Sequence, residues 1–563
     1  MTESSGRLLP ELTETNEFFW KSGEDGKLRF QRCSSCGELR HPPSAVCPYC
    51  RSTEWAPAEV SGRGVVAGIT FNEQMWIPSF PPPYLIAIVA IEEDDRIRLT
   101  TNLVNVAPDD VFVGMKVQVT FEHDDDIWIP LFEPTGETDK GPFPAKDPKA
   151  REARPMPKGA DKFEDRVAVT GVGISRVGRR LMLDPIVLAV QAAEAAIADA
   201  GLTRDDIDGL STYPGGGMMG ASAMSEGGVT AMEEALRIRP SWINGGMETP
   251  GQGGAVIAAM LAVAGGLCNH VLCFRTVWEA TFAARQRAAM SGAPGSASAI
   301  VPMGGGRVGG DMQWRLTYGA SSAANWIAMQ ASAHFDLYGT TRETLGYIAL
   351  NGRKNAALNP WAIYKDPLTM DDYLEARNIS SPFGLYDCDV PCDGSVAIIV
   401  SRKDLAADLR QPAIYVEAVG TQVTERMSWD QGSLDHEPLV TGPAAHLWTR
   451  TDLKPTDIHM AQLYDGFTFN CLSWIEALGF CGWGEAKDFL EGGTNIARDG
   501  LLPLNTHGGQ LSAGRLHGYG FIHEAITQLR GQAGERQVAR AETAVVSTGG
   551  GAPGGCFLFT TAR

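Results

Sequence analysis

The sequence predicts an α/β protein whose larger part contains two similar halves, preceded by a small β-rich module. Strand-like and helix-like segments alternate from residue 166 onward, which is typical of sheets with helical crossovers. In addition, Leu202–Tyr213 (LTRDDIDGLSTY) and Leu453–Tyr464 (LKPTDIHMAQLY) share Leu, Asp, Ile and Tyr at a constant offset of 251 residues. Matched order together with matched local sequence favours an internal duplication over chance.

The overall composition is that of a globular protein and argues against two classes of partner. The chain has 563 residues, a hydrophobic content of 44% and a net charge of -19. A nucleic-acid partner is disfavoured, because binding to phosphates needs clustered Lys and Arg. The longest nearly apolar run, Ala255–Cys268, is too short to span a bilayer, and the first twenty residues lack the pattern of a signal peptide. We therefore expect a cytoplasmic protein without membrane insertion.

Four cysteines near the N-terminus have the spacing of a zinc ribbon. Cys33 and Cys36 form one CxxC pair, Cys47 and Cys50 form a second, and ten residues separate the pairs. Four thiolates at this spacing close a tetrahedral zinc site and leave no open position for a substrate water. We predict a structural Zn²⁺ in a module that spans residues 1–60 and also contains a short N-terminal helix.

Residues 61–135 are expected to form a small OB-fold β-barrel. Short segments rich in Val, Ile, Thr and Tyr, such as Gly64–Phe71 and Tyr84–Ile91, are separated by Gly, Pro and Asp. Several short strands after a zinc ribbon suggest this kind of barrel. Residues 1–135 contain 11 Lys and Arg against 21 Asp and Glu. That balance again disfavours a surface for nucleic acid.

Residues 136–165 are predicted to link this module to the α/β part. The segment is rich in Pro, Lys, Asp and Gly and has almost no apolar periodicity. Such a composition has little to bury and indicates an extended tether. A tether that fuses two modules implies that both act at one site.

The first half of the region 166–563 alternates between strands and helices. A strand is predicted at Arg166–Gly173 and a helix at Pro185–Ala200, which Gly201 ends. A glycine-led helix at Gly251–Gly266 follows, and then a strand at Cys268–Arg275. An inserted loop region at about residues 278–400 separates this half from the second one.

The second half is centred on Asn505–Glu524, where a glycine-rich loop carries Arg515, His517 and Tyr519 into a helix. Glycines let the backbone approach a ligand closely, and the helix start favours an anion. A flexible loop ahead of a helix is the alternative for this stretch. A strand at Thr543–Ser547 follows this helix. The alternation in both halves predicts parallel strands with helical crossovers. If the two halves pack face to face, both glycine-led helix starts point toward one centre.

Two parts of the chain resemble known families. Residues 15–135 resemble the zinc-ribbon and OB-fold domains that accompany thiolase-like acyl-CoA enzymes, through the four cysteines, Phe18–Trp20 and Gly114–Glu122. Residues 166–563 resemble the thiolase superfamily, and most of all its sterol-carrier-protein-x thiolases and lipid-transfer-type enzymes. The motifs that carry this likeness are Ala333–Glu343 (AHFDLYGTTRE), Asp387–Gly394 (DCDVPCDG) and Gly549–Gly555 (GGGAPGG). The resemblance implies duplicated βαβαβ halves in αβαβα layers and a homodimer.

The chain departs from the thiolase pattern at the reacting residues. Asn244–Gly251, where the family has its nucleophilic cysteine, contains none. Ser547 stands in place of the second family cysteine, which acts as acid and base. Tyr464–Phe467 (YDGF) replaces an Asn- or His-led motif, and Gly514–Gly518 (GRLHG) replaces a Gly-His-Pro loop. Thiolysis needs an attacking thiolate that accepts the acyl group, so a different reaction is expected.

Steroid side-chain aldolases of the lipid-transfer type also lack that cysteine. The resemblance to them implies retro-aldol cleavage of a bulky β-hydroxyacyl-CoA with a steroid or aryl side chain. The products are a ketone or aldehyde and a shorter acyl-CoA such as propionyl-CoA or acetyl-CoA. We expect Tyr464 to act as base or proton relay with help from His517 or Arg515, and Arg515 and the loop amides to stabilise the enolate. The other expected substrate-binding residues are Asp465, Tyr519, Gly509 and Gly550.

Other interpretations remain open at this point. The chain is alternatively a thiolase or acyltransferase with a displaced cysteine, or a non-catalytic carrier of lipid or acyl-CoA. Tyr464 is alternatively an ordinary aromatic residue at a strand end, and His517 a helix cap or pocket wall. Asp465 is alternatively a turn residue that bonds to neighbouring backbone.

Overall fold

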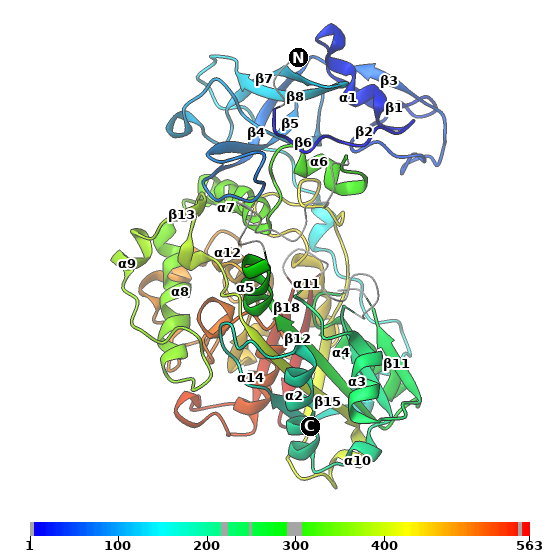
Figure 1. Cartoon of the computed structure of the whole chain (residues 1–563), viewed down its shortest axis with the longest axis vertical. Helices are drawn as coiled ribbons and strands as arrows, with labels where there is room; N and C mark the ends of the chain where they lie inside the picture. Colours follow the sequence, from blue (N-terminus) through cyan, green and yellow to red (C-terminus); the bar gives the residue numbers. More distant parts are fainter. Residues whose placement is uncertain (1–4, 215–222, 247–249, 290–306, 550–553, 563) are drawn as a thin grey trace.

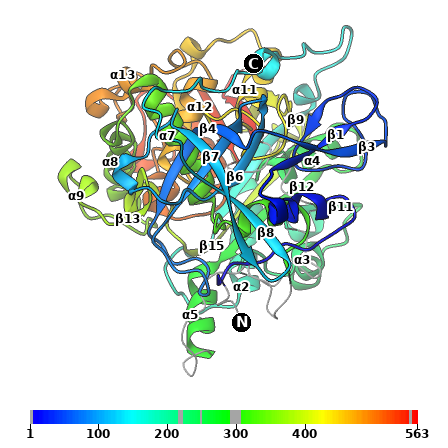
Figure 2. The ribbon, with the colours of Figure 1, turned by 90° about the horizontal axis from the view of Figure 1, so that it is seen from above.

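The computed structural model describes residues 5–214, 223–246, 250–289, 307–549 and 554–562. The β-rich N-terminal part, coloured blue to cyan, lies at one end of the molecule, and the α/β part forms the rest (Figure 1). Seen from above, the strands of the N-terminal part lie across the end of the α/β part (Figure 2). Helix α7 (Ala323–Tyr338) of the α/β part packs against strand β4 (Arg63–Asn72) of the N-terminal part.

The ribbon is a small antiparallel sheet with the order β2-β1-β3. Its strands are β1 (Arg29–Cys33), β2 (Leu39–Arg40) and β3 (Trp55–Glu59). Each CxxC pair lies on a tight turn, in which the N–H of Gly37 donates to the Cys33 carbonyl at 2.9 Å and that of Arg51 to the Cys47 carbonyl at 3.0 Å. These two turns bring the four cysteines together.

The predicted barrel is a strongly curled antiparallel sheet. Its strands are β4 (Arg63–Asn72), β5 (Tyr84–Ile91), β6 (Asp94–Thr101), β7 (Lys116–Asp124) and β8 (Ile127–Pro134). Strand β4 pairs with β5 and β7, while β6 pairs with β5 and β8 pairs with β7. The two outer strands come together where Leu103, just after β6, pairs with Phe132 of β8. The curled sheet encloses its own core of Val, Ile, Leu and Phe side chains.

The α/β part contributes residues to the core and to the sheet of the N-terminal part. Trp314, in helix α6 (Gln313–Leu316), stacks on Trp20 of helix α1 (Glu17–Trp20) with ring centroids 5.0 Å apart. Strand β13 (Asn378–Ser380) extends the barrel sheet by pairing Ser380 with Asn72 of β4. The N-terminal part is therefore docked through a shared aromatic core and a shared sheet edge.

The linker prediction is correct for the extended backbone and wrong for the absence of buried contacts. Apart from two short 3₁₀ turns, Pro148–Arg151 and Phe163–Arg166, residues 136–165 have no helix or strand. Glu164 is nevertheless fully buried and accepts two hydrogen bonds from Arg450, both at 2.6 Å. The Ala150 carbonyl accepts hydrogen bonds from the hydroxyls of Thr424 and Thr441. The segment is thus fastened along the surface of the α/β part.

The strands of both halves are hydrogen-bonded along one path of nine, in the order β11-β10-β12-β15-β9-β16-β19-β18-β17. The first half supplies β9 (Val167–Ile174), β10 (Gly209–Thr212), β11 (Trp242–Gly245), β12 (His270–Trp278) and β15 (Asp393–Arg402). The second half supplies β16 (Ile414–Gly420), β17 (Met460–Gln462), β18 (Thr543–Thr548) and β19 (Gly555–Thr560). Only β10 with its two neighbours and β17 with β18 run parallel. The expectation of parallel strands throughout is therefore wrong, because β15 and β19 return antiparallel.

The order of strands supports the duplication. Reading outward from the β9–β16 junction, β15, β12 and β10 of the first half correspond to β19, β18 and β17 of the second. The repeated segments at offset 251 form the same elements, a 3₁₀ turn followed by β10 in one half and by β17 in the other. Helix α2 (Pro185–Ala200) covers β9, β12 and β15, and helix α11 (Thr441–Trp448) covers β16 and β19.

Two glycine-led helices lie between the halves. Helix α4 (Gly254–Ala264) packs on strands of the first half, and helix α14 (Tyr519–Leu529) contacts β17 and β18 of its own half and β9 and β15 of the other. The remaining long helix near the centre is α8 (Arg342–Ala357), which packs against the loop ahead of α14. This arrangement gives the predicted αβαβα layers.

Candidate active site at the junction of the two halves

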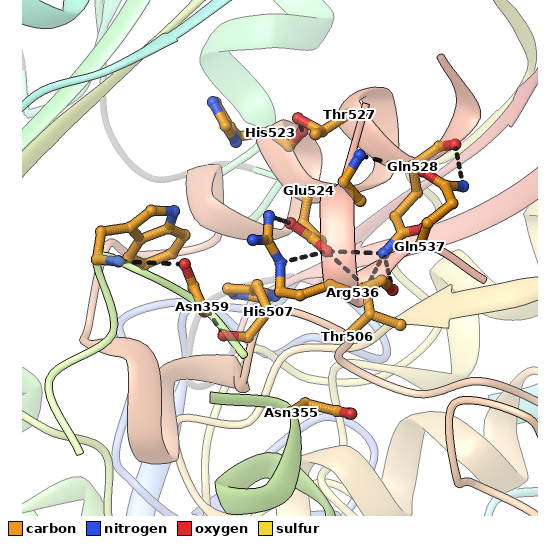
Figure 3. Close-up of polar contacts among 12 residues, drawn as sticks. Asn355, Asn359, Thr506, His507, His523, Glu524, Thr527, Gln528, Arg536 and Gln537 are labelled. Atoms are coloured by element: carbon orange, nitrogen blue, oxygen red, sulfur yellow. Dashed lines mark hydrogen bonds and ion pairs between the residues drawn. The ribbon is translucent and has the colours of Figure 1, made fainter. Parts of the chain in front are cut away.

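The glycine-rich loop ahead of α14 is held in place by asparagines of α8 and the turn after it. The side chain of Asn355 donates hydrogen bonds to the carbonyls of Leu504 and Asn505 at 3.0 and 3.3 Å. Asn359 donates to the carbonyl of His507 at 2.8 Å, as Figure 3 shows. Side-chain amides thus satisfy loop carbonyls that no strand or helix would satisfy. The alternative of a flexible loop is not supported by these contacts.

A buried carboxylate ties the beginning of the loop to the helix that follows it. Glu524, which is fully buried in α14, accepts hydrogen bonds from Thr506 at 2.8 Å and Gln528 at 3.0 Å (Figure 3). Its other oxygen pairs with Arg536 at 2.9 Å. Removing one partner of such a buried pair costs several kcal/mol, of the order of 3–5. The network therefore holds the backbone of the loop in position, and we assign it no part in the reaction.

The glycine-led starts of α4 and α14 converge, as predicted. A Cβ atom on Gly518 would lie 3.3 Å from the Cβ of Gln252, and one on Gly251 would lie 2.6 Å from the carbonyl oxygen of Thr548. Both glycines have positive φ, 82° and 60°. Since L side chains are strained there and no room is left, glycine is required at both positions. The two helix starts and the end of β18 form one centre.

Tyr464 lies beside this centre at the end of β17. It is 6% exposed, and its N–H donates to the hydroxyl of Ser547 at 2.9 Å. Its ring lies against Gly466, where a Cβ atom would be 2.7 Å from ring carbon Cε1 and 3.1 Å from the hydroxyl. Ser547, at the predicted position of the second family cysteine, thus accepts a hydrogen bond that orients the Tyr464 backbone.

Asp465 organises the glycine-rich loop. Its Oδ1 accepts from the N–H of Gln510 at 2.7 Å and its Oδ2 from the amide of Asn505 at 3.0 Å. A Cβ atom on Gly509 would lie 1.8 Å from Oδ2, so the absence of a side chain at Gly509 makes room for this carboxyl. Burial raises the pKa of Asp465 to about 8. Asp465 and Gly509, both predicted to bind substrate, contact each other.

Arg515 is bracketed by two carboxylates. Its guanidinium makes a two-pronged contact with Glu279 at 2.7 and 2.8 Å, and its third nitrogen lies 3.0 Å from Asp389. Burial alone would lower the pKa of Arg515, but Asp389 and Glu279 outweigh it and raise that pKa. Burial in turn raises the pKa of the Asp389 carboxyl to about 7. The charge on Arg515 is therefore balanced within the protein, and its field also reaches Tyr464.

His517 joins the two halves at the same centre. Its Nδ1 lies 3.1 Å from the hydroxyl of Tyr213 and 3.3 Å from Nη2 of Arg275. Burial, with the positive charges of Arg275 and Arg515, holds the pKa of His517 well below its usual value. The imidazole is thus neutral, so any help that His517 gives to Tyr464 does not come from a positive charge on the ring. A neutral imidazole still offers one donor and one acceptor.

The other predicted site residues are less informative. Tyr519, the first residue of α14, is fully buried, and its hydroxyl has no hydrogen-bond partner among the described residues. Burial raises its pKa well above the usual value. Gly550 and the positions 247–249, within the segment where a thiolase has its nucleophile, lie outside the described residues.

Four further residues at the site were not predicted from the sequence: Tyr213, Glu279, Asp389 and Arg275. Tyr213 had a signal, because it ends the first copy of the repeat at the place where Tyr464 ends the second. The Arg275 guanidinium carbon lies 4.5 Å from the centre of the Tyr213 ring, a cation–π contact. Glu279 and Asp389 had no signal, because they come from separate segments that only the fold brings to Arg515.

The cysteines outside the ribbon are seven thiols whose pKa values are raised. They are Cys268, Cys273, Cys388, Cys392, Cys471, Cys481 and Cys556. Burial raises the pKa of each one, for example that of Cys268 to about 11. Cys392, which lies next to the loop, has its sulfur 3.6 Å from the Arg515 carbonyl. A thiolate nucleophile is therefore disfavoured at every one of these positions.

The four ribbon cysteines have the geometry of a metal site. Their sulfurs lie within 4.8 Å of one another, with Cys33 to Cys50 at 3.5 Å and Cys36 to Cys47 at 3.6 Å. Zn–S bonds of about 2.3 Å in a tetrahedron place the sulfurs about 3.8 Å apart. The donor set and its spacing thus fit one tetrahedral ion. Within the part of the chain that the structure describes, no helix is long and apolar enough to cross a membrane.

Comparison with known protein families agrees with this architecture. Residues 20–56 match the family described as "ChsH2, rubredoxin-like zinc ribbon domain" and residues 58–122 match "ChsH2, C-terminal OB-fold domain". Residues 440–554 match "Thiolase C-terminal domain-like". The predicted ribbon, OB-fold and thiolase-like parts are therefore confirmed.

Individual relatives cover most of the α/β part. The steroid side-chain-cleaving aldolase of Thermomonospora curvata is 33% identical over 391 residues, 69% of this chain and 95% of the relative. The 17-hydroxy-3-oxo-4-pregnene-20-carboxyl-CoA lyase of Mycobacterium tuberculosis is 33% identical over 397 residues, 69% of this chain and 97% of the relative. A solved structure, the "Ltp2-ChsH2(DUF35) aldolase", is 31% identical with a TM-score of 0.60 and covers 70% of this chain and 97% of its own. The chain therefore belongs to the thiolase-like acyl-CoA aldolase family.

Proposed function

We propose that this protein cleaves a β-hydroxyacyl-CoA by a retro-aldol reaction at the centre formed by Tyr464, Tyr213 and His517. One observation carries the proposal. The two glycine-led helix starts converge beside a Tyr213 hydroxyl that lies 3.1 Å from Nδ1 of His517, while burial raises the pKa of every thiol outside the ribbon. Helix starts suit a developing anion, and tyrosine and histidine suit proton transfer.

The reaction needs one proton transfer out and one back. A base removes the proton of the β-hydroxyl, the Cα–Cβ bond breaks, and the β-carbon leaves as a ketone or aldehyde. The electron pair of that bond passes to the thioester as an enolate, which takes a proton at Cα to give the shorter acyl-CoA. Tyr464 is the proposed base, and hydrogen-bond donors of the loop stabilise the enolate oxygen. No oxidant, reductant or net proton is consumed.

His517 and Arg515 act on this centre in different ways. Neutral His517, held by Tyr213, is placed to relay a proton. Arg515 keeps its charge through Glu279 and Asp389 and favours the phenolate form of Tyr464 by its positive field. Asp465, Gly509 and Tyr519 shape the loop and pocket around them, and we propose Gly550 as a further backbone contact for the substrate.

The substrate proposed is a steroid or similarly bulky side-chain β-hydroxyacyl-CoA, with propionyl-CoA or acetyl-CoA as the shorter product. The names of both curated relatives support this substrate class. The test is incubation of the purified protein with a panel of β-hydroxyacyl-CoAs in D₂O, followed by mass spectrometry. We expect a ketone or aldehyde and a shorter acyl-CoA that carries one deuterium at Cα, without added free CoA. Turnover that requires free CoA would instead indicate a thiolase.

We also propose one structural zinc per chain, a homodimer formed through the thiolase-like part, and domain divisions near residues 60, 135 and 165. The four-sulfur cluster supports the zinc, which Cys33, Cys36, Cys47 and Cys50 would hold as a closed site. Metal analysis should give one equivalent. Light scattering should give about twice the chain mass of 60.4 kDa; a monomeric mass would contradict the dimer.

A further inference from the structure

A cavity of about 1040 Å³ lies where the ribbon, the barrel, the linker and the α/β part meet. It is separate from the residues around Tyr464 described above, none of which lines it. Its walls come from the β2 region, the first residues of β6, residues 143–147 of the linker and residues 424–435 of the α/β part. A cavity of this size has room for a drug-sized ligand.

Three guanidinium groups line this cavity without an ion pair to any described residue: Arg40, Arg98 and Arg426. Arg40 is 4% and Arg98 7% exposed. Two of the three Arg40 guanidinium nitrogens, Nε and Nη2, have no hydrogen-bond partner within the described part of the chain. Arg426 makes only long contacts, 3.3 to 3.5 Å, to Gln431 and the His41 carbonyl. Arg98 donates to the carbonyls of Asp95 and Gly432, so it lacks a counter-charge rather than hydrogen bonds, and Arg426 is exposed. Two buried cations without a counter-ion are costly, so this cluster favours an anion.

The carboxylates in the same walls are engaged elsewhere. Asp94 pairs with Arg96 at 2.7 Å, and Asp435 pairs with Lys146 at 2.5 Å. Asp95 accepts the N–H of Ala145 at 2.7 Å. Glu425 accepts two hydrogen bonds from Ser433, and burial raises its pKa to about 7. Asp147 caps a 3₁₀ turn, and the buried Asp430, which does not line the cavity, accepts hydrogen bonds from Thr100 and Ser428. None of these carboxylates forms an ion pair with the three guanidinium groups.

The rim of the cavity offers a surface for a planar ring. Tyr49 is 57% and Val46 46% exposed, although both are apolar residues. The Arg96 guanidinium lies 5.7 Å from the centre of the Tyr49 ring. An aromatic ring next to a cationic group stacks on nucleobases with little dependence on their identity. The cavity thus combines a phosphate-binding cluster with a platform for a base.

We propose that this cavity binds the phosphorylated adenosine end of coenzyme A, with its phosphates at Arg40, Arg98 and Arg426 and its adenine on Tyr49. The inference rests on the proposed function, since an acyl-CoA substrate supplies that group. Guanidinium groups suit phosphates because of their planar array of donors. The site would give the N-terminal part a role in holding the substrate, and would explain why the linker and both parts line one cavity.

Calorimetry on the full-length protein tests the site without any turnover. Free CoA should bind the unsubstituted protein, and Arg426→Gln and Arg40→Gln should each weaken its Kd at least tenfold. Arg32→Gln, at an exposed arginine of β1, is the matched control and should change nothing. Pantetheine, which lacks the nucleotide, should bind all four proteins alike. Zinc content and the thermal midpoint check folding. Arg426 is exposed, so Arg426→Gln keeps the test valid if Arg40→Gln unfolds.

The outcomes separate this site from the proposed reaction. Unchanged CoA binding in Arg426→Gln and Arg40→Gln would overturn the site, even if the protein cleaves β-hydroxyacyl-CoAs. Arginine-dependent CoA binding would support it, even if no cleavage is found. ADP should compete with CoA in the same titration; ADP that binds without displacing CoA would overturn the assignment to coenzyme A. Where turnover is seen, Arg426→Gln should raise KM at least tenfold and leave kcat within about twofold.

Discussion

The hydroxyl of Tyr213 lies 3.1 Å from Nδ1 of His517, so that one residue from each half of the duplicated fold forms a single polar pair. Tyr213 ends the first copy of the repeat and Tyr464 ends the second, 251 residues later. The duplication therefore places two buried tyrosines after equivalent strands, Tyr213 one residue after β10 and Tyr464 two residues after β17. The hydroxyl of Tyr213 contacts His517 of the glycine-rich loop, whereas the backbone N–H of Tyr464 donates to the hydroxyl of Ser547. The base is assigned to Tyr464 because Tyr464–Phe467 stands where the thiolase superfamily has its Asn- or His-led motif.

Replacing Tyr464 by Phe removes the hydroxyl and little else. Because general acid–base catalysis contributes roughly 10²–10⁴-fold, we expect kcat to fall at least about 100-fold. CoA binding should change less than about threefold, since the ring remains. Steady-state kinetics and calorimetry measure the two quantities. Tyr347→Phe, on helix α8 outside the site, is the control. Equal losses in kcat and binding would make Tyr464 a pocket residue.

Gly509→Ala tests the close contact between the loop and Asp465. Gly509 has a φ of 61°, and a Cβ atom there would lie 1.8 Å from Asp465 Oδ2. Gly531 has a similar φ of 68° but no atom within 4 Å of its Cβ position. Backbone strain alone costs roughly 1–2 kcal/mol, so Gly531→Ala should lose about that much. Gly509→Ala should lose about 3 kcal/mol or more in urea unfolding. Equal losses of unfolding free energy in the two variants would show that the loop shifts to accommodate the added methyl group.

The pH dependence of stability is expected to include a contribution from His507. Burial lowers the pKa of His507 to about 4 in the folded protein, whereas an unfolded chain has about 6.5. Between these values the unfolded state binds more protons, so the free energy of unfolding falls as the pH drops. The slope is at most about 1.4 kcal/mol per pH unit for this residue. Urea unfolding at pH 7, 6 and 5 measures this contribution. The free energy of unfolding of His507→Asn should fall less steeply with decreasing pH than that of the unsubstituted protein, by up to this slope.

The exposed His123 provides the comparison for this pH effect. His123→Asn removes an imidazole from an exposed position and is the matched control for the removal of the buried ring of His507. If His507→Asn and the unsubstituted protein lose stability in parallel from pH 7 to pH 5, His507 is charged in the folded protein and the expectation fails.

Loss of one ribbon cysteine should release the metal. Cys47 is fully buried and its sulfur lies 3.6 Å from that of Cys36. Cys47→Ala should therefore lower zinc content from one equivalent to near zero and destabilise the N-terminal part, because a structural zinc contributes folding energy. Plasma mass spectrometry and thermal unfolding measure both effects. Cys481→Ala, outside the ribbon, should keep one equivalent. Full zinc content in Cys47→Ala would exclude a four-cysteine site.

The sequence by itself determined the elements with strong local signals. The CxxC spacing defined the ribbon, and Pro185–Ala200 was predicted with the bounds it has as α2, ended by Gly201 in the left-handed conformation. The repeat at offset 251 predicted two equivalent strands, each followed by a tyrosine. Local propensity and spacing decide such features, because the interactions involved lie within a few residues of each other.

Only the tertiary structure decided which groups meet and in what ionisation state. Glu279 and Asp389 are 236 and 126 positions before Arg515 in the chain, and no local pattern announces their contact. The loss of charge on His517 likewise follows from burial beside Arg275, which the sequence does not encode locally. The antiparallel return strands and the fastening of the linker depend on long-range pairing. Sequence patterns report local geometry, whereas desolvation and long-range contacts exist only once the chain has folded.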